Sequence, residues 1–490
     1  MDSKKLEGSS KSTGESENTK KKNSQNSGTK QQEEWSFSGT NCYRYETWNT
    51  FLANKSPLNN DYPVSGDRLA LTLKYQLPWT TFTSTLDGVK FFNLPNKASF
   101  GAGSTYFSNG NEQNFGKVFF RTLNFTFKRI GDKGMSGTIG RFDYSNGTEC
   151  KSDNKTVDWV KSNRISDRLI GTSNWTLYQR SMNGIYLKRD NGRFQGAASA
   201  WCPTAGTYSK QAGDIMTAVK VLTLAGTFKY NTFFPNQEFQ LFCYNYDDSR
   251  AVVAARADNT VTGAKKTASV STGGIDVNMR TYGCSAVGAY ESSDSTIDTM
   301  VWFALQRGDW YNLAHKAYAY AVEAGYQWKK TPWKPWFRAG LNQSSGDSNP
   351  NDGDHKTFFC MMPTRKYSGT CAYNLMNARD TFAQLMLKPN TRLQVRFDYH
   401  QLKLAESADR WYTGGGAMSN TGTVNGFTAR SSGGKTDLGS AIEFTGTYTL
   451  NKNFKTTLYA SRFNGGDVIE NSFAAEKNQK FSYIELIYDF

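Results

Sequence analysis

Short runs in which apolar and polar residues alternate recur along the chain from residue 35 to the end. In the run 391–404, for example, Leu393, Val395, Phe397 and Tyr399 are separated by polar side chains. A period of two places the apolar residues on one face of a β-strand and the polar residues on the other face. Many of the runs reach the length of about ten residues that a tilted strand needs to cross a bilayer. The pattern therefore predicts strands with one face toward lipid.

Counting these runs predicts about eighteen strands. They are expected near residues 35–46, 68–76, 86–95, 116–129, 135–144, 174–189, 193–202, 219–230, 238–247, 277–290, 299–311, 316–330, 333–344, 379–388, 391–404, 439–450, 454–465 and 480–490. Most connections alternate between short turns, such as Asn191-Gly192, and long segments, such as 145–173, 345–378 and 405–438. The gap at 312–315 is short where a long loop is expected. We predict an all-β fold, a transmembrane antiparallel β-barrel of about 18 strands with short periplasmic turns and long extracellular loops.

The two ends of the chain differ in their residue composition and in their pattern of apolar residues. The final run, 480–490, alternates up to a terminal Phe490, which resembles the recognition signal of outer-membrane barrels. We therefore expect Phe490 to engage the barrel-assembly machinery; a chance aromatic end on a soluble edge strand is the alternative. Residues 1–34 contain no aromatic residue and are rich in Lys, Ser and Glu, which predicts a disordered polar tail before a barrel at 35–490. No apolar leader follows Met1, so we expect a signal peptide to have been removed.

Charge and hydropathy narrow the class of protein. The mean hydropathy is −0.63 and no apolar stretch approaches the ~18 residues of a spanning helix, which excludes a helical membrane protein. The formal net charge is +15, of which residues 1–34 contribute only +1. A basic surplus in the folded part predicts an acidic partner or an anion path, with plain solubility as the alternative. Outer-membrane lipid is the other expected partner, and we expect no nucleic acid and a location in the outer membrane of a Gram-negative bacterium.

Several stretches resemble the alginate-export family of outer-membrane porins. They include "GRFDYSNGTE" at 140–149, "DWVKSNRISDRLIG" at 158–171, "GDSNPNDGDHKTFFCMMPT" at 346–364, "YNLMNARDTFAQLMLKP" at 373–389 and "LQVRFDYHQLKLAESADRWYTGGGA" at 393–417. The resemblance implies an eighteen-stranded monomeric barrel with an electropositive lumen that passes an anionic polysaccharide. The Lys- and Asn-rich texture, the polar tail and the seven cysteines depart from the family and leave the cargo open.

The polar half of each strand would line the lumen of such a barrel. Strand parity predicts the following basic lining residues: Arg44, Lys74, Lys128, Arg141, Arg180, Lys188, Arg338, Arg392, Arg396 and Arg462. Arg164 and Arg168 are added to them if the segment 145–173 folds inward. The predicted acidic lining residues are Glu46, Asp143, Asp398 and Glu443, together with Glu323, Glu485 and Asp489. Arginine suits an anion path because its planar fork binds a carboxylate bidentately. These residues could instead only keep the lumen wet and fix its shape.

Other candidate sites carry weaker signals. Asp347, Asp352 and Asp354 form an oxygen-rich stretch that could hold a structural calcium ion, although the spacing is not that of an EF-hand and a polar surface loop fits better. Cys360 and Cys371 are close enough in sequence to form a disulfide. No other cofactor is expected.

Two further groups of side chains have alternative readings. Asp398 and His400 share a strand face and could act as a catalytic pair, yet there are only three His and no GxSxG motif, so we predict no enzyme. Trp328, Trp333 and Trp336 are expected in an interfacial aromatic girdle, or else stacked on sugars.

The predicted function is an outer-membrane channel for an anionic polysaccharide or oligosaccharide, resembling alginate export. A general porin for small organic anions is the first alternative. A barrel enzyme, or a receptor or structural barrel, is the second. Export of a polymer needs a gate against leakage, and the segment 145–173 is the candidate.

Overall fold

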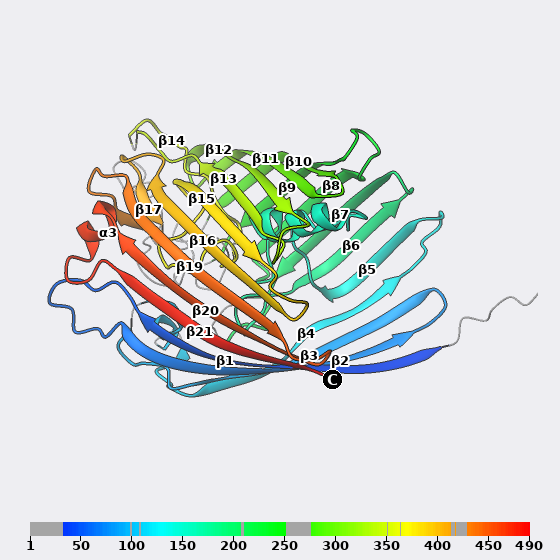
Figure 1. The fold of residues 1–490 in the computed structure, drawn as a ribbon, viewed down its shortest axis with the longest axis horizontal. Helices are drawn as coiled ribbons and strands as arrows, with labels where there is room; N and C mark the ends of the chain where they lie inside the picture. Colours follow the sequence, from blue (N-terminus) through cyan, green and yellow to red (C-terminus); the bar gives the residue numbers. More distant parts are fainter. Residues whose placement is uncertain are drawn as a thin grey trace, which may run out of the picture.

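The computed structural model is a closed antiparallel β-barrel of eighteen strands (Figure 1). It describes residues 33–490 apart from 99, 107–108, 207–209, 251–275, 350, 363, 413–416 and 418–428. The predicted tail 1–34 therefore lies almost wholly outside the described residues. No helix in the described ranges is long and apolar enough to cross a membrane.

The wall strands follow one another in chain order. They are β1 (Glu34–Asn49), β2 (Asp61–Gln76), β3 (Thr80–Phe92), β4 (Phe115–Phe127), β5 (Met135–Phe142), β6 (Met182–Asp190), β7 (Phe194–Pro203), β8 (Val219–Phe228), β9 (Gln237–Asp248), β10 (Val277–Glu291), β11 (Ser295–Trp310), β12 (Leu313–Trp328), β13 (Trp336–Ser344), β15 (Ala378–Leu387), β16 (Leu393–Leu404), β19 (Asp437–Thr449), β20 (Phe454–Gly465) and β21 (Gln479–Asp489). Each matches one predicted strand, so the strand prediction is confirmed, with ends shifted by several residues in some cases.

Smaller elements lie in the connections. They are the 3₁₀ helix η1 (Gly101–Thr105), the α-helix α1 (Lys155–Val160), the π-helix η3 (Lys161–Ile165), the strands β14 (Asp354–His355), β17 (Arg410–Tyr412) and β18 (Ala429–Ser431), and the α-helix α3 (Asp467–Ser472). Connections on one side of the barrel are short turns, and most on the other side are long. The exception is the β11–β12 connection, where the strands nearly meet at Tyr311, as the short gap in the sequence indicated.

The barrel closes between β1 and β21, which pair in register from Thr40 with Asp489 to Asn49 with Lys480. Phe490 continues this seam, because its backbone exchanges two hydrogen bonds of 2.9 Å with Gly39. The Phe490 ring covers Gly39: a Cβ added there would lie 2.2 Å from the ring. The terminal aromatic residue thus packs over the junction of the first and last strands.

Two long connections fold into the barrel rather than away from it. The β5–β6 connection, 143–181, carries α1 and η3, and the β13–β15 connection, 345–377, carries β14. The backbones of the two connections bond to each other, from Gly171 to Met362 and from Met362 to Leu169. Their apolar side chains pack with inward-facing wall residues into two buried clusters, so part of the lumen is a packed core.

Candidate functional site

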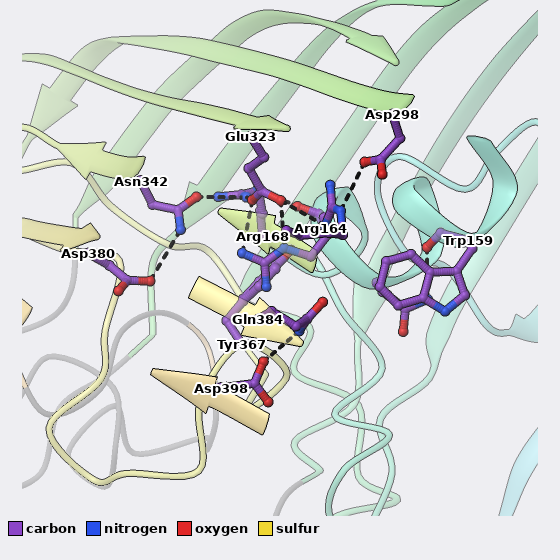
Figure 2. A network of polar contacts seen from close by, with 12 residues as sticks. Trp159, Arg164, Arg168, Asp298, Glu323, Asn342, Tyr367, Asp380, Gln384 and Asp398 are labelled. Carbon is purple, nitrogen blue, oxygen red and sulfur yellow. Dashed lines mark hydrogen bonds and ion pairs between the residues drawn. The ribbon is translucent and has the colours of Figure 1, made fainter. Parts of the chain in front are cut away.

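The centre of the lumen holds a cluster of buried charges. The inward connection 143–181 contributes Arg164 from η3 and Arg168 (Figure 2), and β13 contributes Arg338. All three guanidinium groups meet the carboxylate of Glu323 on β12, whose side chain is completely buried. A charge cluster contributed by two wall strands and one connection ties that connection to the wall.

The geometry of the cluster is close. The Arg164 Nε donates to Glu323 Oε2 at 2.8 Å, and its Nη2 donates to Oε1 at 2.9 Å, a bidentate pair. Arg168 Nη2 and Arg338 Nη1 each approach Glu323 at 3.1 Å. Arg338 also donates to Asp298 on β11 at 2.9 Å. The cluster therefore combines three cations with two carboxylates.

Aromatic rings complete the surroundings of these arginines. The Arg164 guanidinium lies 4.1 Å from the Phe382 ring centre, and Arg168 lies 4.9 Å from that of Tyr367, which suits cation–π contact. Burial opposes the charge of Arg164, but the neighbouring Glu323 outweighs it and raises the pKa of Arg164. Arg164 is thus held charged in a site that excludes water.

A polar belt continues from this cluster along the inner wall. Arg168 donates to Asn342 at 2.9 Å, Asn342 donates to Asp380 at 3.2 Å, and Asp380 faces His400 at 3.0 Å. Beside it, Gln384 donates to Asp398 at 2.6 Å (Figure 2), and Arg396 donates to the same carboxylate at 2.7 Å.

A second charged group lies at the seam of the barrel. Arg44 on β1 donates to Glu485 on β21 at 2.9 Å and lies 3.5 Å from Glu46. Its guanidinium also donates to the Trp175 carbonyl at 2.7 Å and lies 4.8 Å from the ring centre of Trp175 and 4.9 Å from that of Tyr483. The connection 143–181 therefore reaches both sides of the barrel.

Two more contacts hold this connection to the wall. Lys161 forms a buried ion pair with Glu238 on β9. Glu149 accepts hydrogen bonds from the hydroxyls of Tyr144, at 2.7 Å, and Tyr244, at 3.1 Å. The connection is thus anchored by charged and polar groups at several separate places.

Most of the predicted lining residues face the lumen. Those placed on the inner face of a strand are Arg44, Glu46, Lys74, Lys188, Glu323, Arg338, Arg396, Asp398, Glu443 and Glu485. Arg164 and Arg168 enter on the inward connection, as predicted for that case. Glu443 is held by Ser368 and the Gly369 amide of the second inward connection. Each of these acids and arginines is therefore engaged within the protein.

Three predicted lining residues lie at the margins. Lys128 and Arg392 lie in short turns, just outside β4 and β16. Arg180 was predicted in a strand, but β6 begins two residues later, and Arg180 is buried in the connection with its guanidinium on the Ala205 carbonyl. Burial lowers the pKa of Arg180 to about 9.

Two predictions of inward direction are wrong. Arg141 is paired in register with Leu123 and follows Ile139, and both of these side chains point outward. Arg462 is paired with the outward Ile442 and hydrogen bonds to Asn464. The reason is shared: the prediction placed the neighbouring aromatic residues on the lipid face. The structure instead buries Phe142 and Phe463 inside, each in one of the two apolar clusters.

Asp143 was predicted to line the lumen from the inner face of a strand. Asp143 lies one residue beyond β5, where it pairs bidentately with Arg121 at 2.7 and 2.8 Å and not with Arg141. Arg121 sits at a register shift between β3 and β4, which turns it out of the simple alternation.

The calcium prediction stays a prediction, whereas the disulfide prediction is wrong. Asp352 pairs with Lys356 and Asp354 with Lys316, while Asp347 accepts the Asn349 and Lys356 amides. Among the described residues no three His, Cys, Asp or Glu side chains are grouped as a metal site. Cys360 and Cys371 are free thiols, because they pack in the two different apolar clusters.

The proposed catalytic pair and the aromatic girdle also change. His400 faces Asp380 rather than Asp398, and it is buried. Trp328 and Trp333 are exposed as a girdle requires, but Trp336 is buried inside and donates to Asp298 at 2.7 Å.

Sequence reasoning missed several members of the belt. Asp298 lies just before the predicted start of its strand at 299, so a longer alternating run, 295–310, would have included it. Asp380 and Gln384 share a face with the apolar Phe382 and Met386. Because polar and apolar residues are mixed on this face, the sequence of the strand alone does not identify it as the face toward the lumen.

Comparison with known proteins agrees with this architecture. The alginate export family matches residues 160–482, about two thirds of the chain. The solved structure of OpdK from Pseudomonas aeruginosa is similar at a TM-score of 0.54 and 10% identity, covering 93% of this chain and 99% of that one. OccAB2 from Acinetobacter baumannii is similar at 0.58 and 11%, covering 93% and 98%. OpdK with vanillate gives 0.53 and 9%, with the same coverage as OccAB2. No curated protein matches.

Proposed function

Because this chain belongs to the alginate export family and forms an outer-membrane porin-like barrel, we propose that it is a gated channel for anionic polysaccharide or oligosaccharide. The observation that carries the proposal is the meeting of Arg164, Arg168 and Arg338 on one carboxylate inside the lumen. The three arginines would form a cationic constriction. Because Arg164 and Arg168 belong to an inward connection, movement of that connection would open or close it.

The proposal of a gate rests on the burial of Arg164 and Arg168. Arg164 and Arg168 have side chains only 4% and 2% exposed, so a solute cannot reach them in this arrangement. Movement of the connection 143–181 would separate them from Glu323 and turn their guanidinium groups toward water. An incoming carboxylate then takes the place of Glu323, because the Arg fork binds both in the same way. A gate of this kind prevents leakage while no cargo is present.

Arg396 provides a cation that is accessible without this movement. Its side chain is 29% exposed while it pairs with Asp398. A partly solvated arginine binds an anion weakly, which lets cargo leave again. We expect Arg396 to set the anion preference of the entrance.

A porin for small organic anions is the second candidate. It is favoured by the likeness in fold to OpdK, one structure of which was solved with vanillate, although an identity of 9% speaks only for the fold. The two candidates differ in the size of the anion that passes. Family and structural neighbours are channel porins, so an enzyme is not proposed.

Recording from single channels in planar bilayers tests the proposal. We expect a low open probability, anion selectivity that falls in Arg396→Gln, and no change in selectivity in Arg462→Gln, a matched arginine on the outer face. Block by added polyuronate supports the polymer. Passage of small organic anions with no block by polyuronate favours the general porin. A barrel that never conducts, or that prefers cations, contradicts both candidates.

A further inference from the structure

The barrel wall is incomplete beside β5. This strand ends at Phe142, where the chain turns into the lumen, whereas β4 continues for several residues on the long-loop side. In the described residues, β4 pairs with β5 only from Leu123 to Phe127, while Phe115 to Thr122 pair with β3 alone. The free edge of β4 faces the gap between β4 and β6 (Figure 1).

The side chain of Arg141 lies in this gap. Its Nη1 donates to the Phe120 carbonyl on the β4 edge at 2.6 Å, and its Nε donates to Asn183 on β6 at 2.8 Å. Ser181 donates to the next β4 carbonyl, that of Arg121. Two side chains thus replace part of the missing strand pairing.

The gap forms a groove on the outer face of the barrel. Its volume is about 560 Å³. Its rim is apolar, made by Phe120, Leu123, Ile139 and Ile185, each between 42% and 49% exposed. Gly140 and Gly184 leave the floor without side chains. On the lumen side the gap is backed by the β7–β8 connection, where Gly213 lies against Phe119.

The charge in this groove is unusual for a lipid-facing position. Val118 and Phe120 continue the outward apolar face of β4 beyond Leu123, the residue paired with Arg141. No carboxylate of the described residues forms an ion pair with Arg141, and nearby Asp214 is engaged by Lys117 at 2.8 Å. Charged side chains facing lipid are costly, so an arginine retained there is a candidate for a function.

We propose that this groove binds an anionic amphiphile, with its acyl chain on the apolar rim and its anionic group on Arg141. Charge complementarity selects the occupant, because a neutral acyl chain would leave the guanidinium without a counter-ion in an apolar setting. The shared chemistry is an acyl chain that carries a single carboxylate or phosphate. A free fatty acid and an anionic membrane phospholipid both supply it.

The test uses the purified barrel in a non-ionic detergent and the fluorescent fatty acid cis-parinarate as the probe. We expect Arg141→Gln to weaken parinarate binding at least tenfold. Arg462→Gln removes another outward arginine that is hydrogen bonded to an asparagine, and it should leave binding unchanged. Heat-dependent mobility in gel electrophoresis verifies that each variant is folded. If Arg141→Gln does not fold, Ile139→Trp fills the groove, keeps the arginine, and should likewise abolish binding.

Competition separates the sources of the amphiphile. Displacement of parinarate by palmitate supports a fatty-acid site, and displacement by phosphatidylglycerol supports a phospholipid site. Equal displacement by methyl palmitate, which has no charge, overturns the proposal. So does unchanged binding in a folded Arg141→Gln or Ile139→Trp barrel. If Arg141→Gln changes the oligomeric state of the barrel but leaves parinarate binding unchanged, the groove binds a second copy of the chain. That result would also overturn the proposal.

Discussion

Glu323 holds three arginines in the lumen, so its replacement tests the gate directly. Glu323→Gln keeps the size of the side chain and one hydrogen-bond acceptor but removes the negative charge. Arg164, Arg168 and Arg338 would then repel one another in a site where each is at most 4% exposed. The arrangement that buries them becomes unfavourable.

The magnitude follows from burial. Removing one partner of a buried ion pair costs about 3–5 kcal/mol, since the remaining charge is left without compensation. If the connection 143–181 can leave the wall, the closed arrangement loses that amount relative to the open one. At about 1.4 kcal/mol for each factor of ten, the ratio of closed to open barrels should fall about 100-fold or more.

Planar-bilayer recording measures this ratio as the fraction of time spent open. Asp294→Asn is the control, because its pair with Lys330 lies in an exposed turn where the loss of an ion pair has little effect. The double variant Glu323→Gln, Arg164→Gln should close more often than Glu323→Gln alone, since it removes one of the unpaired cations. A folded Glu323→Gln barrel with the wild-type open fraction would refute the account of the gate.

Other predictions concern assembly and the buried thiols. Gly39→Ala should displace the Phe490 ring and slow barrel closure, measured as the rate at which the heat-modifiable folded form appears; Gly88→Ala, whose added Cβ would be 3.8 Å from its nearest neighbour, should fold at the normal rate. Burial raises the pKa of Cys360 to about 12, so the unfolded thiol ionises first and stability should decline from about pH 9 to 12, by about 1.4 kcal/mol per pH unit. Chemical unfolding of Cys360→Ala should show a shallower decline over that range, and an identical decline would contradict the assignment. Maleimide should label neither Cys360 nor Cys371 at pH 7 in the folded barrel but both after unfolding without reductant, whereas a disulfide would prevent labelling in both states.

The fold could be predicted because the lipid imposes one rule on all eighteen strands. An outward face must be apolar whatever lies inside, so rows such as Leu69, Leu71 and Leu73 on β2 identify a wall strand unaided. Turn residues and the lengths of the connections then give the order and the two sides. Both signals are local, and local signals are what a single sequence provides.

The inner face obeys no such rule. Where water fills a lumen the inner residues are polar, but where a connection folds inward they can be as apolar as the outer ones. Phe142 and Phe463 illustrate this: each belongs to a buried cluster, and each misled the direction assigned to the arginine beside it. The partners in question are distant in sequence, as Arg164 and Glu323 are, and alternation within one strand carries no information about them.

Under the proposed gate, the same pairing would make selectivity depend on gating. In the closed arrangement Arg164 and Arg168 share the charge of Glu323, and Arg44 and Arg396 lie beside Glu485 and Asp398, so the lumenal cations are largely neutralised. A solute in the lumen would therefore not meet these arginines as a lining of unpaired positive charges. Opening of the proposed gate would change this balance, because Arg164 and Arg168 would leave Glu323 with the connection that carries them. A variant that opens the channel by loss of Glu323 should thus gain conductance and anion preference together, and a gain of conductance with falling anion preference would show that the arginines do not line the open path.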